Sequence, residues 1–99
     1  MEKLAILAQL EARPGKEQEV EAFLKSALPL AQAEAGTLSW YALKMGPNKF
    51  GIFDTFANEA DRGAHLAGDI AKALFAQAEA LFAHPPVIDQ PEILAAKAQ

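Results

Sequence analysis

The sequence of 99 residues contains no cysteine. This absence excludes disulfides, cysteine-ligated zinc, iron–sulfur clusters and thiol nucleophiles. Imidazole is scarce as well, since the chain has two histidines, and neither lies in a pattern with metal-ligand spacing. The glycines do not fall in the spacing of a dinucleotide or phosphate loop. We therefore expect no metal site and no nicotinamide or flavin cofactor.

Strong charge of one sign and long apolar runs are also missing. Nine lysines and arginines stand against 13 acids, which gives a formal net charge of −4, and no two basic residues are adjacent. Such a chain offers no surface for a phosphate backbone, so nucleic acid is not an expected partner. No stretch approaches the roughly 20 apolar residues of a membrane span, and the first residues do not resemble a secretory signal. We expect a cytoplasmic protein that does not bind a membrane.

The composition that is present, 52% hydrophobic and 22% charged residues, is typical of a single globular domain, here residues 1–99. A chain of this size buries only about 60 to 65% of the surface that its unfolded form exposes. A deep site is difficult to build within one such subunit. A homodimer is therefore expected.

Periodicity along the chain predicts the first four elements. Residues 4–12 alternate as in a strand, and apolar residues at spacings of three and four over residues 20–35 predict a long helix. Pro29 should kink this helix or end its first half near Ala27, because proline lacks an N–H and crowds the preceding turn. Residues 37–45 and 49–56 flank a Gly-Pro-Asn turn and predict a β-hairpin.

Two helices and a last strand follow. Asn58, with an acid three residues later, predicts the start of a helix that contains His65 and stops at Gly68. Asp69 is predicted to cap a second helix that runs to Ala83. Apolar residues between 87 and 94 can supply an edge strand, where the intervening proline is tolerated.

The order strand, helix, strand, strand, helix, strand is the ferredoxin-like βαββαβ arrangement, an α+β fold with an antiparallel sheet and helices on one face. Apolar side chains also alternate onto the other face of the sheet. A second copy of the chain would cover them. Two sheets that pack face to face would form a dimeric α+β barrel.

Three landmarks span most of the chain: Arg13-Pro14-Gly15-Lys16 after the first strand, Gly36-Thr37-Leu38-Ser39 before the second, and Asp54-Thr55-Phe56 followed by Ala64-His65-Leu66. In these landmarks the sequence resembles the antibiotic biosynthesis monooxygenase (ABM) superfamily. In that family the third landmark reads as an acid, any residue and Trp, followed by a helix with an Ala-His-Leu-like step. Here Phe56 takes the place of the Trp.

The resemblance implies a dimeric α+β barrel and a choice among activities. Family members include oxidoreductases that oxidise phenols or hydroquinones with O₂ and no cofactor, haem-degrading enzymes, and proteins without demonstrated activity. In the haem-degrading branch an axial His ligates the iron, and Phe75 occupies its position here. Because that imidazole is missing, no haem is expected.

His65 is the first candidate catalytic residue, because an imidazole near neutral pH can take a proton from a phenol and return one to a peroxide. Alternatively, it is a helix histidine bonded to the backbone. Asp54 shares a strand face with apolar residues, so it must find a partner or shift its pKa. It either orients His65 or binds a phenolic hydroxyl, or it pairs with Arg62 or caps the next helix. Arg62 either stabilises a phenolate or superoxide, or is a solvated surface residue.

Four aromatic residues are candidates for substrate binding: Trp40, Tyr41, Phe53 and Phe56. Trp40 and Tyr41 should point to opposite faces of their strand, so that one lines an internal pocket and the other enters the dimer interface. Alternatively, each of the four is simply a core residue. His84 precedes two prolines at a helix end. We expect it to cap the helix there, because a positive charge interacts favourably with the dipole at that end.

Together these features predict a homodimeric, cofactor-independent monooxygenase that oxidises a small phenol or quinol with O₂ to a quinone. The alternative is a non-catalytic dimer of the same fold that binds a small ligand or assists a pathway enzyme. The substitution of Phe56 for the family Trp favours the alternative slightly.

Overall fold

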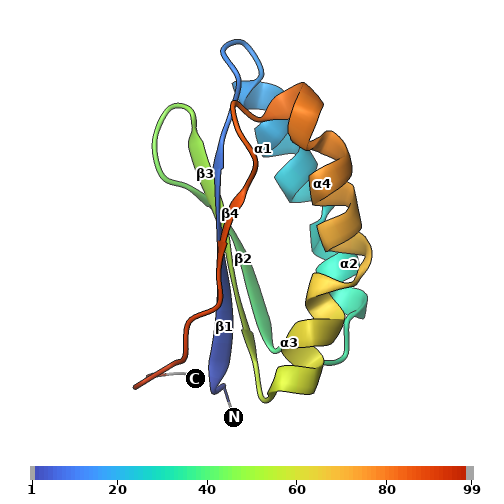
Figure 1. The fold of residues 1–99 in the computed structure, drawn as a ribbon, viewed down its shortest axis with the longest axis vertical. Helices are drawn as coiled ribbons and strands as arrows, with labels where there is room; N and C mark the ends of the chain where they lie inside the picture. Colours follow the sequence, from blue (N-terminus) through green and yellow to red (C-terminus); the bar gives the residue numbers. More distant parts are fainter. Residues whose placement is uncertain (1, 98–99) are drawn as a thin grey trace.

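A four-stranded antiparallel sheet of order β2-β3-β1-β4 lies against a layer of helices in the computed structural model, which describes residues 2–97 (Figure 1). This is the ferredoxin-like α+β fold that the sequence predicts. The elements are β1 (Leu4–Glu11), α1 (Glu17–Ser26), α2 (Leu28–Ala33), β2 (Ser39–Lys44), β3 (Lys49–Phe56), α3 (Glu59–Leu66), α4 (Asp69–Leu81) and β4 (Val87–Asp89).

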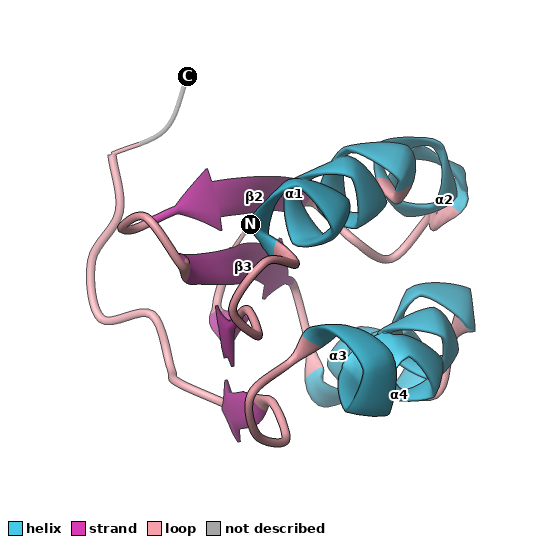
Figure 2. Ribbon diagram, turned by 90° about the horizontal axis from the view of Figure 1, so that it is seen from above, coloured by secondary structure: helices cyan, strands magenta, loops and turns pink. Residues whose placement is uncertain are grey.

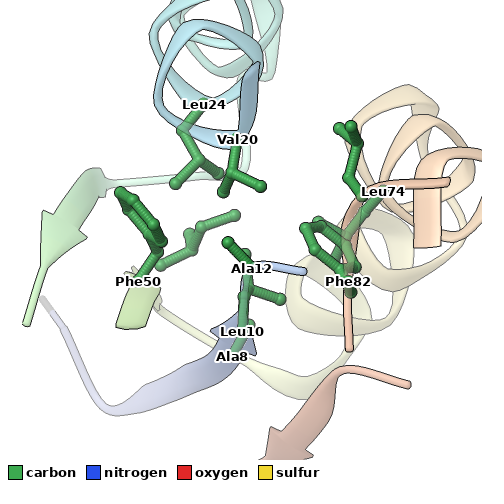
Figure 3. Packing of buried hydrophobic residues seen from close by; sticks show 10 residues of the cluster. Ala8, Leu10, Ala12, Val20, Leu24, Phe50, Leu74 and Phe82 are labelled. Atoms are coloured by element: carbon green, nitrogen blue, oxygen red, sulfur yellow. The ribbon is translucent and has the colours of Figure 1, made fainter. Parts of the chain in front are cut away.

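All helices lie on one side of the sheet. Figure 2 shows α1 and α2 in one row and α3 and α4 in a second row beside it. The core between the layers contains Val20 and Leu24 of α1, Leu74 of α4, and Leu10 and Phe50 of the sheet (Figure 3). Strand residues of even number on β1 and β3 face this core, because side chains alternate along a strand. Among residues 2–97 no helix has the length and apolar character to cross a membrane.

The predicted long helix is divided at Ala27 into α1 and α2. Pro29 lies in the first turn of α2, where a missing N–H costs no helical hydrogen bond. The predicted start of α3 is confirmed, since Oδ1 of Asn58 accepts a hydrogen bond of 2.9 Å from the backbone N–H of Asp61. Proline and cap chemistry therefore place both helix boundaries.

Two predicted boundaries of α4 are wrong. Gly68 is the cap, and Asp69 is the first helical residue and caps nothing. The helix ends at Leu81 and not at Ala83, because the chain after it pairs with the end of β1. The N–H of Ala83 donates to the carbonyl of Glu11 at 2.8 Å, and Phe82 forms a β-bridge with Ala12.

Arg62 ties α3 to the sheet. Its Nη1 donates to the carbonyls of Ala5 at 3.0 Å and Pro91 at 3.1 Å, which joins the helix to β1 and to the segment after β4. Its Nε and Nη2 donate to the carboxylate of Glu59. Arg62 is buried and Glu59 is largely exposed, so the bonds to the two carbonyls carry most of the stabilisation.

We expect Arg62→Ala to lower the free energy of unfolding by about 3 kcal/mol, because the change leaves two carbonyls without their charged donor. Glu59→Gln, the matched control, should cost less than about 1 kcal/mol, since its partner bond is solvent-screened. Urea unfolding followed by circular dichroism measures both values. An equal loss in the free energy of unfolding in the two variants would contradict the conclusion that the bonds of Arg62 to the two carbonyls carry most of the stabilisation.

Candidate functional site

His65 lies between two carboxylates that reach it from different elements. Its Nε2 is 2.8 Å from Oδ2 of Asp54 on β3, and its Nδ1 is 2.5 Å from Oε1 of Glu34, the residue that ends α2. The Asn58 cap starts α3 directly after β3 and turns the face of the helix that holds His65 toward the sheet. The site therefore joins α2, α3 and β3.

Both inner members of this cluster are buried. Asp54 is 0% exposed and His65 is 7% exposed. The ring of Phe56 packs beside the imidazole, with the ring centroids 5.3 Å apart. Burial by itself lowers the pKa of His65, but the carboxylates of Asp54 and Glu34 outweigh it and raise the pKa above its usual value of 6.5. The protonated imidazole is thus stabilised near neutral pH.

Three buried polar atoms at this site have no hydrogen-bond partner among residues 2–97: Nε1 of Trp40 and both carboxylate oxygens of Asp54. The contact of the Asp54 carboxylate with His65 is an ion-pair contact of 2.8 Å. Trp40 and Asp54 are directly paired across β2 and β3 and point to the same face. Buried polar atoms are usually paired, and for the Asp54 carboxylate the charged partner is His65.

The cluster opens to the surface through a hollow of about 360 Å³ between the α2–β2 connection and the α3–α4 junction. Glu34, Thr37 and His65 belong to its wall, together with Asp61, Asp69 and Lys72. A second hollow of about 300 Å³ lies beside Trp40 and shares Thr37 with the first. Small polar molecules can thus approach His65 from this hollow, whereas Asp54 behind the ring is fully buried.

The structure brings some of the predicted site residues together and separates others. His65, Asp54, Trp40 and Phe56 lie on the helix-facing side of the sheet. Tyr41 and Phe53 are paired on the opposite, open face, so Trp40 and Tyr41 point to opposite faces as predicted. All three guanidinium nitrogens of Arg62 donate to Glu59 or to the two carbonyls, so the side chain is directed at the sheet and at its own helix.

Glu34 and Thr37 are absent from the sequence-based list of site residues. Oγ1 of Thr37 donates to Oε1 of Glu34 at 2.7 Å and thereby fixes the carboxylate that bonds His65. The only sequence signal is position, since Thr37 belongs to the second landmark and Glu34 lies two residues before it begins. His84 is remote from the site and exposed, with Nε2 at 3.7 Å from Glu11. Among residues 2–97 no group of three or more His, Asp or Glu side chains could hold a metal ion.

The profile of the antibiotic biosynthesis monooxygenase family matches residues 4–77. The chain belongs to this family. The matched residues run from β1 into α4 and include Glu34, Asp54 and His65. No curated protein matches the chain.

Several solved structures have the same fold over almost the whole length of this chain. A protein of unknown function from Nitrosomonas europaea, NE2512, is 56% identical, with a TM-score of 0.97 over 100% of this chain and 96% of that one. PA3566 from Pseudomonas aeruginosa is 24% identical, with a TM-score of 0.80 over 96% and 97% of the two chains. Rv0793 from Mycobacterium tuberculosis is 18% identical, with a TM-score of 0.84 over 97% and 99%. The last two likenesses concern the fold alone.

The raised pKa of His65 predicts a pH-dependent stability. A group whose pKa is higher in the folded than in the unfolded state stabilises the fold fully below the unfolded value, about 6.5, and loses this effect as pH rises through the folded value. We therefore expect the free energy of unfolding of the wild type to fall over this range relative to His65→Gln. Urea unfolding between pH 6 and 9 tests this. His84→Gln is the control and should follow the wild type; parallel curves for the wild type and His65→Gln would refute the prediction.

Proposed function

We propose that the protein is a cofactor-independent monooxygenase that oxidises a small phenol or quinol with O₂ to a quinone. The observation that carries this proposal is the imidazole of His65, oriented by the sealed carboxylate of Asp54 and reachable from a hollow. Membership in the monooxygenase family supports the reaction class. The volume of about 360 Å³ is near the lower end for ligand pockets and suits a small ring system.

The substrate supplies the electrons in this reaction. Neutral His65 takes the proton of the phenolic O–H, and the resulting phenolate passes one electron to O₂. The ring radical and superoxide then form a C–O bond, and protonated His65 gives its proton to the distal peroxide oxygen. Cleavage of the O–O bond, with loss of the ring C–H proton, releases water and leaves the quinone carbonyl. One oxygen atom enters the product and the other enters water.

The other residues of the site serve this proton shuttle. Asp54 holds the ring through Nε2 and compensates the charge of the imidazolium. Trp40 lies beside Asp54 on the helix-facing side of the sheet, and Phe56 excludes water beside the imidazole. Arg62 keeps α3 in place through its bonds to the two backbone carbonyls and has no chemical step.

Oxygen uptake by metal-stripped protein with a panel of hydroquinones, naphthoquinols and anthrones tests the activity. We expect uptake with quinone formation, and a loss of about 10²-fold or more in His65→Ala, the range typical of a positioned acid–base group. His84→Ala, which removes the exposed histidine, should keep full activity.

If the folded protein shows no oxygen uptake with any compound of the panel, the enzyme proposal is overturned. The alternative, a small-ligand-binding protein, then has one specific observation in its favour: both ring nitrogens of His65 already have carboxylate partners. Quenching of the fluorescence of Trp40 by unreacted panel compounds would support that alternative.

We also propose that two copies pack through the open face of the sheet. Leu7, Tyr41, Phe53 and Val87 alternate onto this face, and Tyr41 and Val87 are exposed. Water-exposed apolar side chains on adjacent strands are typical of a protein interface. Tyr41 and Phe53 would then act at the interface, while Trp40 and Phe56 act at the site.

Light scattering should give a mass near twice the 10.6 kDa of one chain. Tyr41→Glu should shift the protein to the single-chain mass, because a carboxylate would be buried at the interface. Phe75→Glu is the control, since Phe75 on α4 is equally exposed, 54% against 55% for Tyr41, but lies in the helix layer. A single-chain mass for the wild type at micromolar concentration would exclude the dimer.

A further inference from the structure

Glu34 is held in place at the site and is not a loose surface acid. Its Oε1 accepts hydrogen bonds from Thr37 Oγ1 at 2.7 Å and lies 2.5 Å from Nδ1 of His65. Its Oε2 lies so close to Gly68 that a Cβ at that position would approach it to 3.1 Å. A glycine at the α3–α4 junction therefore leaves the room that this carboxylate occupies.

The two carboxylates on His65 differ in access. Asp54 is fully buried on β3, whereas the side chain of Glu34 is 23% exposed and forms part of the wall of the 360 Å³ hollow. Of these two partners, only Glu34 can exchange a proton with a molecule in the hollow. Asp54 faces Nε2 at 2.8 Å and is fully buried, so in the relay proposed below the proton on Nε2 stays at this contact.

Other charged groups surround His65 without bonding to its ring. Arg62, one turn earlier on α3, is bound to Glu59 and to backbone carbonyls. The remaining charged residues line the same hollow from α3 and α4: Asp61, Asp69 and Lys72. The hydrogen bonds and ion pairs of residues 2–97 connect the ring nitrogens to Glu34 and Asp54 only. Glu34 is thus the group whose removal acts most directly on Nδ1.

We propose that Glu34 is a positioning residue that holds His65 against Asp54 and relays protons between Nδ1 and the hollow. In the relay, Nδ1–H gives its proton to the Glu34 carboxylate, and the resulting carboxylic acid releases it to water or substrate oxygen; the reverse sequence recharges the ring. No electron is transferred. The catalytic use of this relay rests on the proposed monooxygenase function, but the relay itself exists without substrate.

Glu34→Gln tests the positioning role, because glutamine keeps the size and the bond to Thr37 but has no charge. NMR titration of the His65 ring in the substrate-free protein should give a midpoint lower than in the wild type, since one of the two stabilising carboxylates is lost. Asp61→Asn, which removes an acid from the same hollow without touching the ring, should shift the midpoint less. An unchanged midpoint in Glu34→Gln, or an equal shift in both variants, would overturn the assignment.

The relay is tested by exchange of the His65 Nδ1 proton with water, again without substrate. Exchange should slow by about tenfold in Glu34→Ala and recover on addition of formate, a small carboxylate that fits the enlarged hollow. Unchanged exchange, or slowed exchange that formate does not restore, would overturn the relay.

If the panel identifies a substrate, kcat of Glu34→Gln should fall with little change in KM. A lower KM with a higher kcat would instead mean that Glu34 competes with the substrate for Nδ1. Because the two NMR measurements need no turnover, failure of the relay and failure of the proposed function give different results.

Discussion

The imidazole of His65 between two carboxylates is the interaction on which the site depends. Asp54 comes from the central part of the sheet and Glu34 from the end of α2, so the ring connects α3 to the strand before it and to a helix about 30 residues earlier. A buried carboxylate such as Asp54 is costly unless a cation or donor compensates it. His65 supplies that compensation, and the same contact provides an oriented proton carrier beside a hollow.

Stability and chemistry therefore have opposite preferences at this residue. The fold is most stable when His65 is protonated, whereas a phenol needs the neutral ring as proton acceptor. The carboxylates act on both properties. They raise the pKa of the ring, which stabilises its protonated form and makes the neutral ring a stronger base. The two faces of the sheet are likewise divided in the proposed function: the helix-facing side holds the titratable cluster, and the open side holds the apolar residues of the proposed interface.

The local sequence predicts the elements well because their causes are local. Proline at position 29 divides the first helix region, and the side chain of Asn58 starts α3. The errors arise where a distant segment intervenes: α4 ends early because Ala83 pairs with Glu11 of β1. Sequence reasoning offers a contact of Asp54 with His65 as one of several alternatives, but it misses Glu34, whose only relation to His65 is through space.

The sequence by itself determined the α+β class, the order of the elements and the alternation that puts Trp40 and Tyr41 on opposite faces, because hydrophobic period and cap chemistry act over a few residues. The tertiary structure alone decided what the polar residues do. Packing of α3 on β1 directed the guanidinium of Arg62 to backbone carbonyls and Glu59, and the approach of α2 to Gly68 brought Glu34 to the imidazole. Such partnerships depend on distances between elements, and residue spacing along a chain contains no measure of them.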